Sequence, residues 1–271
     1  MNDTEVMDMH IIFIEDDVEQ ECVKKQAILD TLEAELAQNE LALVTLRANL
    51  ILFERRYVRI VGVLHAKFDE LEVKIAEFLV TRYPNNQRVA AFSHQAQAHA
   101  RESSQASFAW DAAQPPFDFV NITSDCFRPS QHLKQYYREI AKRIHPDLAS
   151  ADEERKFRTA LMIEANIAFQ AGNELRLQEI LSQWEQNADM FKGEDSPEML
   201  TRLTLRVRRV EERLLSIKDE MDHLLVSPLY QIYCQVEEAE KHDIDLLAAM
   251  AERLKDKISR HQERLKALAN T

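Results

Sequence analysis

Apolar residues recur along the first part of the chain at alternating steps of three and four residues. The series runs through Leu29, Leu32, Leu36, Leu43, Leu46, Leu50, Phe53, Tyr57, Ile60 and Leu64. This heptad spacing places its members on one stripe of a helix, which is the pattern of a coiled-coil seam. Asn39 fills the one gap, and a polar seam residue of this kind specifies register or oligomeric state. The pattern predicts a coiled coil over residues 18–80, after an N-terminal tail over residues 1–17.

The spacing of this seam changes after Leu64, where the next apolar residue is Phe68. A step of four in place of three is a stutter, which locally unwinds a supercoil. Gly62 lies beside the stutter and weakens a helix by about 1 kcal/mol relative to alanine. We therefore expect a kink at Gly62, or a turn there that makes the segment a helical hairpin.

A second seam lies near the other end of the chain. It consists of Leu200, Leu203, Val207, Val210, Leu214, Ile217, Met221 and Leu224. Ser227-Pro228 ends this helix because proline cannot continue it, and another apolar stripe follows from Ile244 to Leu268. Two striped helices joined by a short break predict an antiparallel helical hairpin over residues 191–271. The pattern leaves open whether the coiled segments pair within one chain or between copies as a homo-oligomer.

Residues 81–116 have the composition of a linker. Pro84 interrupts the first seam, and Pro115-Pro116 close the segment in a region where extended backbone is favoured. The stretch between them is small and polar, with no strong apolar face. We expect a linker over residues 81–116, part of which could be helical.

The central segment, residues 117–190, predicts an antiparallel pair of short helices and a third helix. Its first helix carries an apolar stripe of Leu133, Tyr137, Ile140 and Ile144. Pro146 ends that helix, because the residue before a proline is pushed out of the α region. A second helix with an apolar face is expected over about residues 152–171, and Gly172 stops it. Trp184 then points inward from the third helix.

Positive charge gathers on one face of the helix before Pro146. Lys134, Arg138 and Lys142 are spaced four residues apart, and Arg143 adds a fourth cation. The chain as a whole has a net charge of −13, so this face stands out. Taken alone, it is also what a solvated helix face looks like.

The tripeptide His145-Pro146-Asp147, at the end of a basic helix and before a returning apolar helix, resembles the J domain of DnaJ-type co-chaperones. The run "EANIAF", which begins at Glu164, stands where the family has an Asn/Ala/aromatic run. The stretch "FDFVNITSDCF", which begins at Phe117, matches the family's first helix poorly. The glycine- and phenylalanine-rich region and the zinc module of full DnaJ proteins have no counterpart here. The resemblance is to a form with flanking coiled coils.

The resemblance implies a partner and a set of contact residues. The basic face would dock on an acidic surface of a DnaK-type chaperone, and the tripeptide would promote its ATP hydrolysis. The residues so assigned are Lys134, Arg138, Lys142, Arg143, His145, Pro146 and Asp147. The coiled coils would select the location or the client, which the sequence does not identify. The expected fold is all-α, with a central J-domain-like hairpin between an N-terminal coiled coil and a C-terminal antiparallel hairpin.

Composition narrows the classes of function further. Charged residues make up 30% of the chain and glycine occurs only three times, which favours long charged helices. The acidic balance argues against nucleic acid and anionic membrane as general partners. The three cysteines are scattered, and no glycine-rich phosphate loop or nucleophile accompanies His145, so we expect no metal, no cofactor and no enzyme. Neither a secretory signal nor a membrane span is visible, so we expect a cytoplasmic protein.

Two alternatives remain. The chain could be a coiled-coil scaffold or adaptor in which the J-like module is structural, with His145-Pro146-Asp147 an ordinary turn. It could also be a J-type co-chaperone for iron–sulfur assembly, although the long N-terminal coiled coil and the central module count against that. Co-purification of a DnaK-type chaperone would distinguish the scaffold from both co-chaperones.

Overall fold

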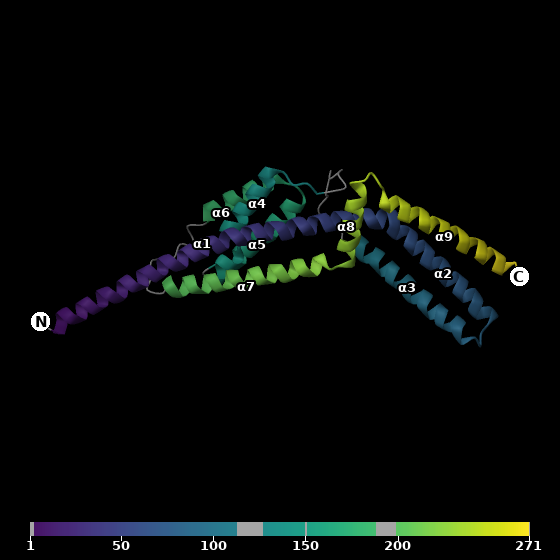
Figure 1. Ribbon diagram of the computed structural model, residues 1–271, viewed down its shortest axis with the longest axis horizontal. Helices are drawn as coiled ribbons and strands as arrows, with labels where there is room; N and C mark the ends of the chain where they lie inside the picture. Colours follow the sequence, from purple (N-terminus) through teal and green to yellow (C-terminus); the bar gives the residue numbers. More distant parts are fainter. Residues whose placement is uncertain (1–2, 113–126, 150, 188–198, 271) are drawn as a thin grey trace. The chain divides into compact units, whose positions relative to one another are not determined.

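The computed structural model describes residues 3–112, 127–149, 151–187 and 199–270 (Figure 1). All regular elements in these ranges are helices, which confirms the all-α prediction for the described part of the chain. Among these elements, no helix combines the length and the apolar character needed to cross a membrane. The chain divides into two compact units. Unit 1 is Met1–Asn49 with Phe127–Val226, and unit 2 is Leu50–Cys126 with Ser227–Thr271.

Unit 1 contains most of the long N-terminal helix and five further elements. Helix α1 is Asp3–Tyr57, and the division between the units falls within it. The remaining elements are α4 (Gln131–Ile144), the 3₁₀ turn η2 (Pro146–Leu148), α5 (Asp152–Gln170), α6 (Glu174–Asn187) and α7 (Met199–Leu225). Figure 1 shows α7 running beside α1, with α4, α5 and α6 grouped as a small bundle.

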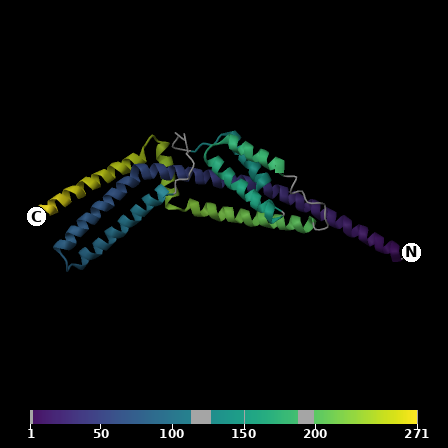
Figure 2. The ribbon, with the colours of Figure 1, turned by 180° about the vertical axis from the view of Figure 1, so that it is seen from behind.

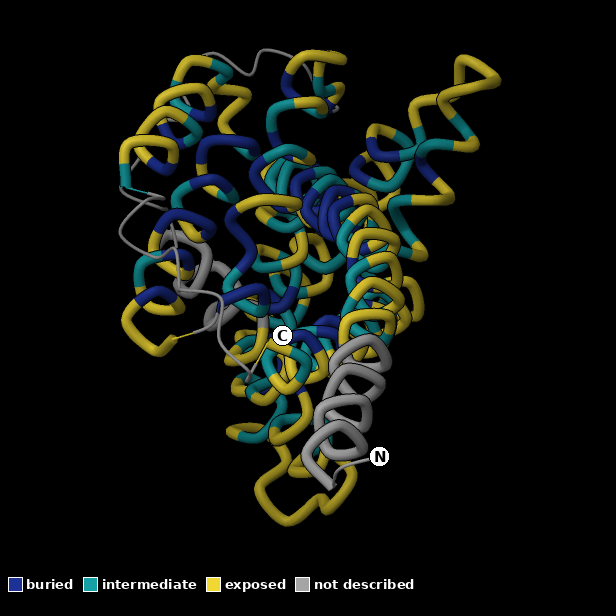
Figure 3. The backbone as a smooth tube through the Cα atoms, turned by 90° about the vertical axis from the view of Figure 1, so that its left-hand side faces the viewer, coloured by how far each residue is buried: buried dark blue, intermediate teal, exposed yellow. Residues whose placement is uncertain are grey.

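The seams of α1 and α7 form one apolar cluster. It joins Leu29, Leu36 and Leu43 of α1 to Leu203, Val207, Val210 and Ile217 of α7. Within the described residues, the first seam therefore finds its partner in the same chain. Buried and exposed residues alternate along the helices of the described chain, as expected for helices that pack through part of their surface (Figure 3).

Three ion pairs fix the direction and register of this helix pair. They join Glu33 to Arg206, Glu40 to Arg213 and Arg47 to Glu220, at 3.3, 2.8 and 2.5 Å. Each pair spans 173 positions of the chain. A constant offset means that α1 and α7 run parallel, and the pairs recur once per heptad. Oppositely charged residues flanking an apolar seam in this way select orientation and register.

Helix α1 buries a second stripe that the sequence analysis did not find. Ala37, Leu41, Val44 and Ala48 are all 5% exposed or less, and they follow one another at steps of four, three and four. These residues lie beside the leucine seam rather than on it. The described part of α1 therefore has two buried faces, which is why it is less amphipathic than a helix that covers a single core.

The described part of unit 2 consists of the end of α1, four further helices and a π-helical turn. The turn is η1 (Val58–Gly62), and the helices are α2 (Val63–Arg82), α3 (Gln87–Ala112), α8 (Pro228–Glu240) and α9 (Leu246–Ala269). Helix α2 packs between α3 and α9, as the view from behind also shows (Figure 2). The apolar core of unit 2 joins Phe53 and Val61 to Val236, Leu247 and Leu254. Ser227 and Asp245 cap α8 and α9 by accepting backbone N–H groups.

The predicted linker over residues 81–116 is wrong for most of its length. The chain breaks at Pro84 as expected, but α3 follows at once and packs on α2. Alanine and glutamine form helices well, and Ala96, only 2% exposed, shows that small residues suffice for close helix packing. Residues 113–116, and the region 117–126 where the family's first helix was sought, lie outside the described residues.

The predicted C-terminal hairpin over residues 191–271 is also wrong. Helix α7 belongs to unit 1 and packs on α1, whereas α9 belongs to unit 2 and packs on α2. The break at Ser227-Pro228 is real, but it separates the two stripes instead of folding them together. Residues 191–198 lie outside the described residues.

The turn considered at Gly62 does not occur. Gly62 has ordinary right-handed helical angles, φ −59° and ψ −42°, and the helix runs on into α2. The five residues before α2 form a π-helical turn instead. Each π turn adds a residue to the helix, so the altered spacing after Leu64 is absorbed without a reversal of the chain.

Alanine substitutions at two glycines should change stability in opposite directions. Gly62→Ala should stabilise unit 2 by about 0.5–1 kcal/mol, because alanine favours helix and its Cβ would meet the Val58 side chain at 3.4 Å, an ordinary contact. Gly172→Ala should destabilise unit 1 by about 1–2 kcal/mol, because φ is +67° there although no atom crowds the site. Amide hydrogen exchange of the surrounding helices in the full chain measures both effects. Slower exchange around Gly172→Ala, or faster exchange around Gly62→Ala, would contradict them.

Candidate functional site

The bundle of α4, α5 and α6, called the module below, has an aromatic core. Tyr137 is fully buried, and its ring centre lies 4.8 Å from that of Phe169, which in turn lies 5.4 Å from Phe127. The Tyr137 hydroxyl donates to Asn166 Oδ1 at 2.6 Å, so the buried polar group is satisfied. Asn166 belongs to the run "EANIAF", which therefore has a structural role in holding α5 on α4.

The tip of the α4–α5 pair is a tight turn. Helix α4 ends at Ile144, and His145 is extended, as expected before a proline. The Nδ1 atom of His145 accepts the backbone N–H of Asp147 at 3.2 Å and so caps the 3₁₀ turn. The Asp147 carboxylate accepts from Arg155 on α5 at 3.2 Å. Side chains of the tripeptide thus organise the turn that connects the two helices.

Arg158 of α5 ties this turn to the rest of the module. Its guanidinium donates to the backbone oxygens of Arg143 and His145, at 2.8 and 3.3 Å. It forms a buried ion pair with Glu154 at 2.7 Å and lies 4.4 Å from the Trp184 ring centre on α6. Burial lowers the pKa of Arg158, while the charge of Glu154 and its hydrogen bond act to raise it. The sequence analysis missed Arg158, because a charged residue on an exposed-looking helix gives no sign that it caps the carbonyls of another helix.

His145 is buried, which the sequence did not predict. Only 3% of the residue is exposed, and its Nε2 atom lies 3.1 Å from Glu40 Oε1 of α1. Because Nδ1 already accepts a hydrogen bond, the neutral ring carries its proton on Nε2 and donates it to Glu40. Pro146 and Asp147 are half-buried. In this conformation the histidine of the tripeptide contacts its own chain.

Glu40 receives a second hydrogen bond from Arg213 of α7, at 2.8 Å. Burial acts to raise the pKa of Glu40, but the hydrogen bonds from His145 and Arg213 and the positive charge of Arg213 outweigh it and hold the pKa below the ordinary value. The seam prediction singled out Asn39, yet Asn39 is half-buried and its neighbour Glu40 is the buried polar residue. A sequence signal for Glu40 does exist: charges at seven-residue spacing on α1 match opposite charges at the same spacing on α7.

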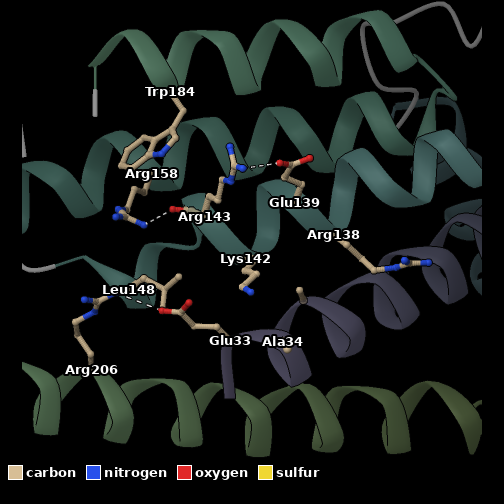
Figure 4. A pocket seen from close by; sticks show the side chains of 11 residues that line it. Glu33, Ala34, Arg138, Glu139, Lys142, Arg143, Leu148, Arg158, Trp184 and Arg206 are labelled. Carbon is tan, nitrogen blue, oxygen red and sulfur yellow. Dashed lines mark hydrogen bonds and ion pairs between the residues drawn. The ribbon is translucent and has the colours of Figure 1, made fainter. Parts of the chain in front are cut away.

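The predicted basic face is divided by the structure. Arg138 and Lys142 line a groove whose other wall includes Glu33 and Ala34 of α1 (Figure 4). Neither cation has an ion pair among the described residues. Arg143 lines the same groove but is paired with Glu139 at 2.7 Å and with a glutamate of α6 at 3.2 Å.

Lys134, four residues before Arg138 on α4, is half-buried and does not line the groove. The structure therefore keeps Arg138, Lys142 and Arg143 together near the tripeptide and leaves Lys134 apart from them. Burial raises the pKa of Glu33 across the groove, and the charge of Arg206 partly offsets that effect. The groove as a whole carries more positive than negative side chains, which suits an acidic surface.

Comparison with known proteins adds no match: no family model, no curated protein and no solved structure matches the chain. Within the described ranges, histidine, cysteine, aspartate and glutamate side chains nowhere gather in a group of three that could hold a metal ion. The interpretation of the site therefore rests on its own geometry.

Removing Arg158 should destabilise the module strongly. Arg158→Met would remove the buried cation that pairs with Glu154 and donates to the backbone oxygens of Arg143 and His145, at a cost of about 3–5 kcal/mol. Lys156→Met is the matched control, because Lys156 lies on the same helix with an exposed side chain and an exposed partner, and should change stability by about 0.5 kcal/mol or less. Urea denaturation of the full chain, followed by Trp184 fluorescence in a Trp110→Phe background, measures both. Equal midpoints for the two variants would contradict the role of Arg158.

The two glutamates of α1 should respond to acid in opposite directions. Glu40 has a lowered pKa, so its contribution to stability is present above its ordinary value near 4.5 and is lost as the pH falls. Glu33 has a raised pKa, so acid favours its folded form. Glu40→Gln should therefore lose less stability than wild type between about pH 6 and about pH 4, and Glu33→Gln should lose more. Parallel urea titrations at both pH values give the comparison, and the same pH response in both variants would contradict it.

Proposed function

We propose that the chain is a J-domain co-chaperone that docks on a DnaK-type chaperone and stimulates its ATP hydrolysis. The observation that supports this most is the placement of His145-Pro146-Asp147 at the tip of two antiparallel helices, beside two cations of α4, Arg138 and Lys142, that form no ion pair with the described residues. The antiparallel course of α4 and α5 follows from their contacts, since Tyr137 meets Asn166 while Arg158 caps the end of α4. The helices flanking the module would select location or client.

The basic residues would act on association more than on the lifetime of the complex. Arg138 and Lys142 are exposed and unpaired among the described residues, so they are available to an acidic surface. Charges at the rim of an interface steer the encounter and set its orientation. Asp147 would contribute through the turn itself, because its backbone N–H and its carboxylate both hold the loop in shape. The protein would bind no nucleotide and act as no enzyme.

A second candidate function is a scaffold whose module is structural. The contact between His145 and Glu40 favours it, because a histidine that is satisfied inside its own chain needs no partner. On this alternative the tripeptide is a turn that locks the module to α1, and the exposed cations of α4 are a solvated face. The two functions differ in whether a DnaK-type chaperone responds to the protein.

The deciding experiment measures ATP hydrolysis by a DnaK-type chaperone from the same cell with the full chain added. We expect stimulation that Asp147→Asn abolishes. Arg138→Glu should slow association by roughly tenfold at low salt, with an effect that shrinks as salt rises. Lys156→Glu, an equal charge reversal on the exposed side of α5, is the control and should leave association near wild type.

The scaffold would be favoured by the opposite result. In that case neither the wild type nor Glu40→Ala, which frees His145 from its carboxylate partner, would stimulate the chaperone at any concentration. Stimulation that survives Asp147→Asn would also contradict the proposed mechanism, because it would not pass through the tripeptide.

A further inference from the structure

The loop that carries the tripeptide is held closed by two different helices. Beyond His145, Leu148 is 3% exposed and lies in the apolar cluster shared by α1 and α7. The backbone oxygen of Ala149 accepts from Arg209 of α7 at 2.9 Å. One side of the loop is therefore bound to α1 and the other side to α7.

A single buried carboxylate connects the loop to the pairing of these helices. Glu40 accepts from His145 and from Arg213, and Arg213 continues to Glu220 at 2.8 Å. Glu220 also pairs with Arg47 of α1 at 2.5 Å. The same chain of charges that holds α7 on α1 thus supplies the hydrogen-bond acceptor for His145.

We propose that Glu40 and Arg213 form a latch that keeps the His145 loop closed against α1 and α7 and so limits access of the chaperone. This inference rests on the proposed function and adds a regulation to it. With the latch closed, His145 is occupied by Glu40, and α1 forms one wall of the groove that holds Arg138 and Lys142. With the latch open, the tripeptide becomes accessible beside Arg138 and Lys142, which are already exposed when the latch is closed.

The interactions of the latch suit reversible opening. A buried charge is stable only while it keeps its partners, so separating α7 from α1 takes Arg213 away from Glu40 and makes the closed arrangement, with Glu40 buried against His145, less stable. A protein whose competent state is only partly populated binds with an apparent affinity reduced by that fraction. A client helix that takes the place of α7 on the α1 seam, or of α1 on α7, would therefore raise the affinity for the chaperone.

The test uses the full chain with two release variants and one control. Glu40→Ala removes the acceptor of His145, and Arg213→Ala removes the link from Glu40 to α7. Arg208→Gln is the control, because it removes an exposed cation of α7 whose partner, Glu212, lies on the same helix outside the chain of charges that reaches Glu40. Glu40→Gln keeps an oxygen acceptor but no charge, and should fall between wild type and Glu40→Ala.

Amide hydrogen exchange measures the latch directly. The backbone N–H groups of Leu148 and Ala149 donate to His145 O and Pro146 O within the loop, at 3.1 and 3.2 Å, so their exchange reports its opening. In Glu40→Ala we expect these amides to exchange roughly tenfold faster, while the amides around Tyr137 and Phe169 keep their wild-type rates. Arg208→Gln should leave the loop amides near wild type.

Stimulation of the chaperone measures the consequence. The concentration of Glu40→Ala needed for half-maximal stimulation should be about fivefold lower than that of wild type, following the larger open fraction. Adding Asp147→Asn to Glu40→Ala should remove the gain, because the gain passes through the tripeptide.

The outcomes separate the latch from the proposed function. Unchanged loop exchange in both Glu40→Ala and Arg213→Ala overturns the latch, whatever the chaperone does. Faster loop exchange with wild-type stimulation overturns the regulation and leaves the co-chaperone standing. Faster loop exchange with no stimulation by any variant overturns the co-chaperone, and the regulation with it. If Glu40→Ala loosens the whole module, Glu40→Gln gives the comparison, and equal loosening there overturns the latch.

Discussion

The carboxylate of Glu40 is the interaction on which unit 1 depends. It joins an α1 residue to one residue 105 positions away in the loop and to another 173 positions away in α7. A carboxylate with 7% of its side chain exposed is stable only if its donors are in place. An apolar seam can slip by a heptad at modest cost, whereas a slip here would leave a buried charge without a partner. Glu40 therefore fixes three elements at once.

The neighbouring ion pairs specify the orientation and register of α1 and α7. Glu33 with Arg206 and Arg47 with Glu220 lie one heptad to either side of Glu40 and Arg213. The two outer pairs include side chains that are more exposed, so each contributes little stability by itself. Their value is in specifying a parallel pair at one register, since an antiparallel or shifted arrangement would bring like charges together. The central pair then adds the contact with His145, which the outer pairs lack.

The sequence predicted the elements of unit 1 better than their partners. Apolar periodicity located α4, α5, α6 and α7, and Pro146 marked the turn, because these signals are local. The predicted hairpin paired α7 with α9, whereas α7 packs on α1 and α9 packs on α2. An apolar stripe says that a helix is buried but not against what. The heptad-spaced charges carried the missing information for α1 and α7. Reading Glu33, Glu40 and Arg47 against the C-terminal seam would have predicted the pairing.

The candidate site was predicted as a set of residues but not as a surface. Lys142, His145 and Asp147 lie near one another as expected, yet no pattern showed that Glu40 would cover the histidine. A helix with one apolar stripe invites the assumption that its other faces meet water. Ala37 and Ala48 lie on a second buried face of α1, but the sequence does not reveal it, because alanine is as common on exposed helix faces as on buried ones.

A helix with two buried faces couples two equilibria, which here are the pairing of α1 with α7 and the contact between Glu40 and the loop of the module. Helix α1 packs through its leucine seam on α7, and Glu40 at its side holds the loop of the module. Any partner that competes for the seam changes the free energy of the loop contact as well, because Arg213 belongs to both. On the proposed function the coupling would be reciprocal: a chaperone that held the loop open would weaken the packing of α7 on α1 by the same free energy by which loss of α7 would favour its binding. A buried histidine is therefore compatible with binding to another protein, provided that Glu40 releases it when a competing helix displaces α7.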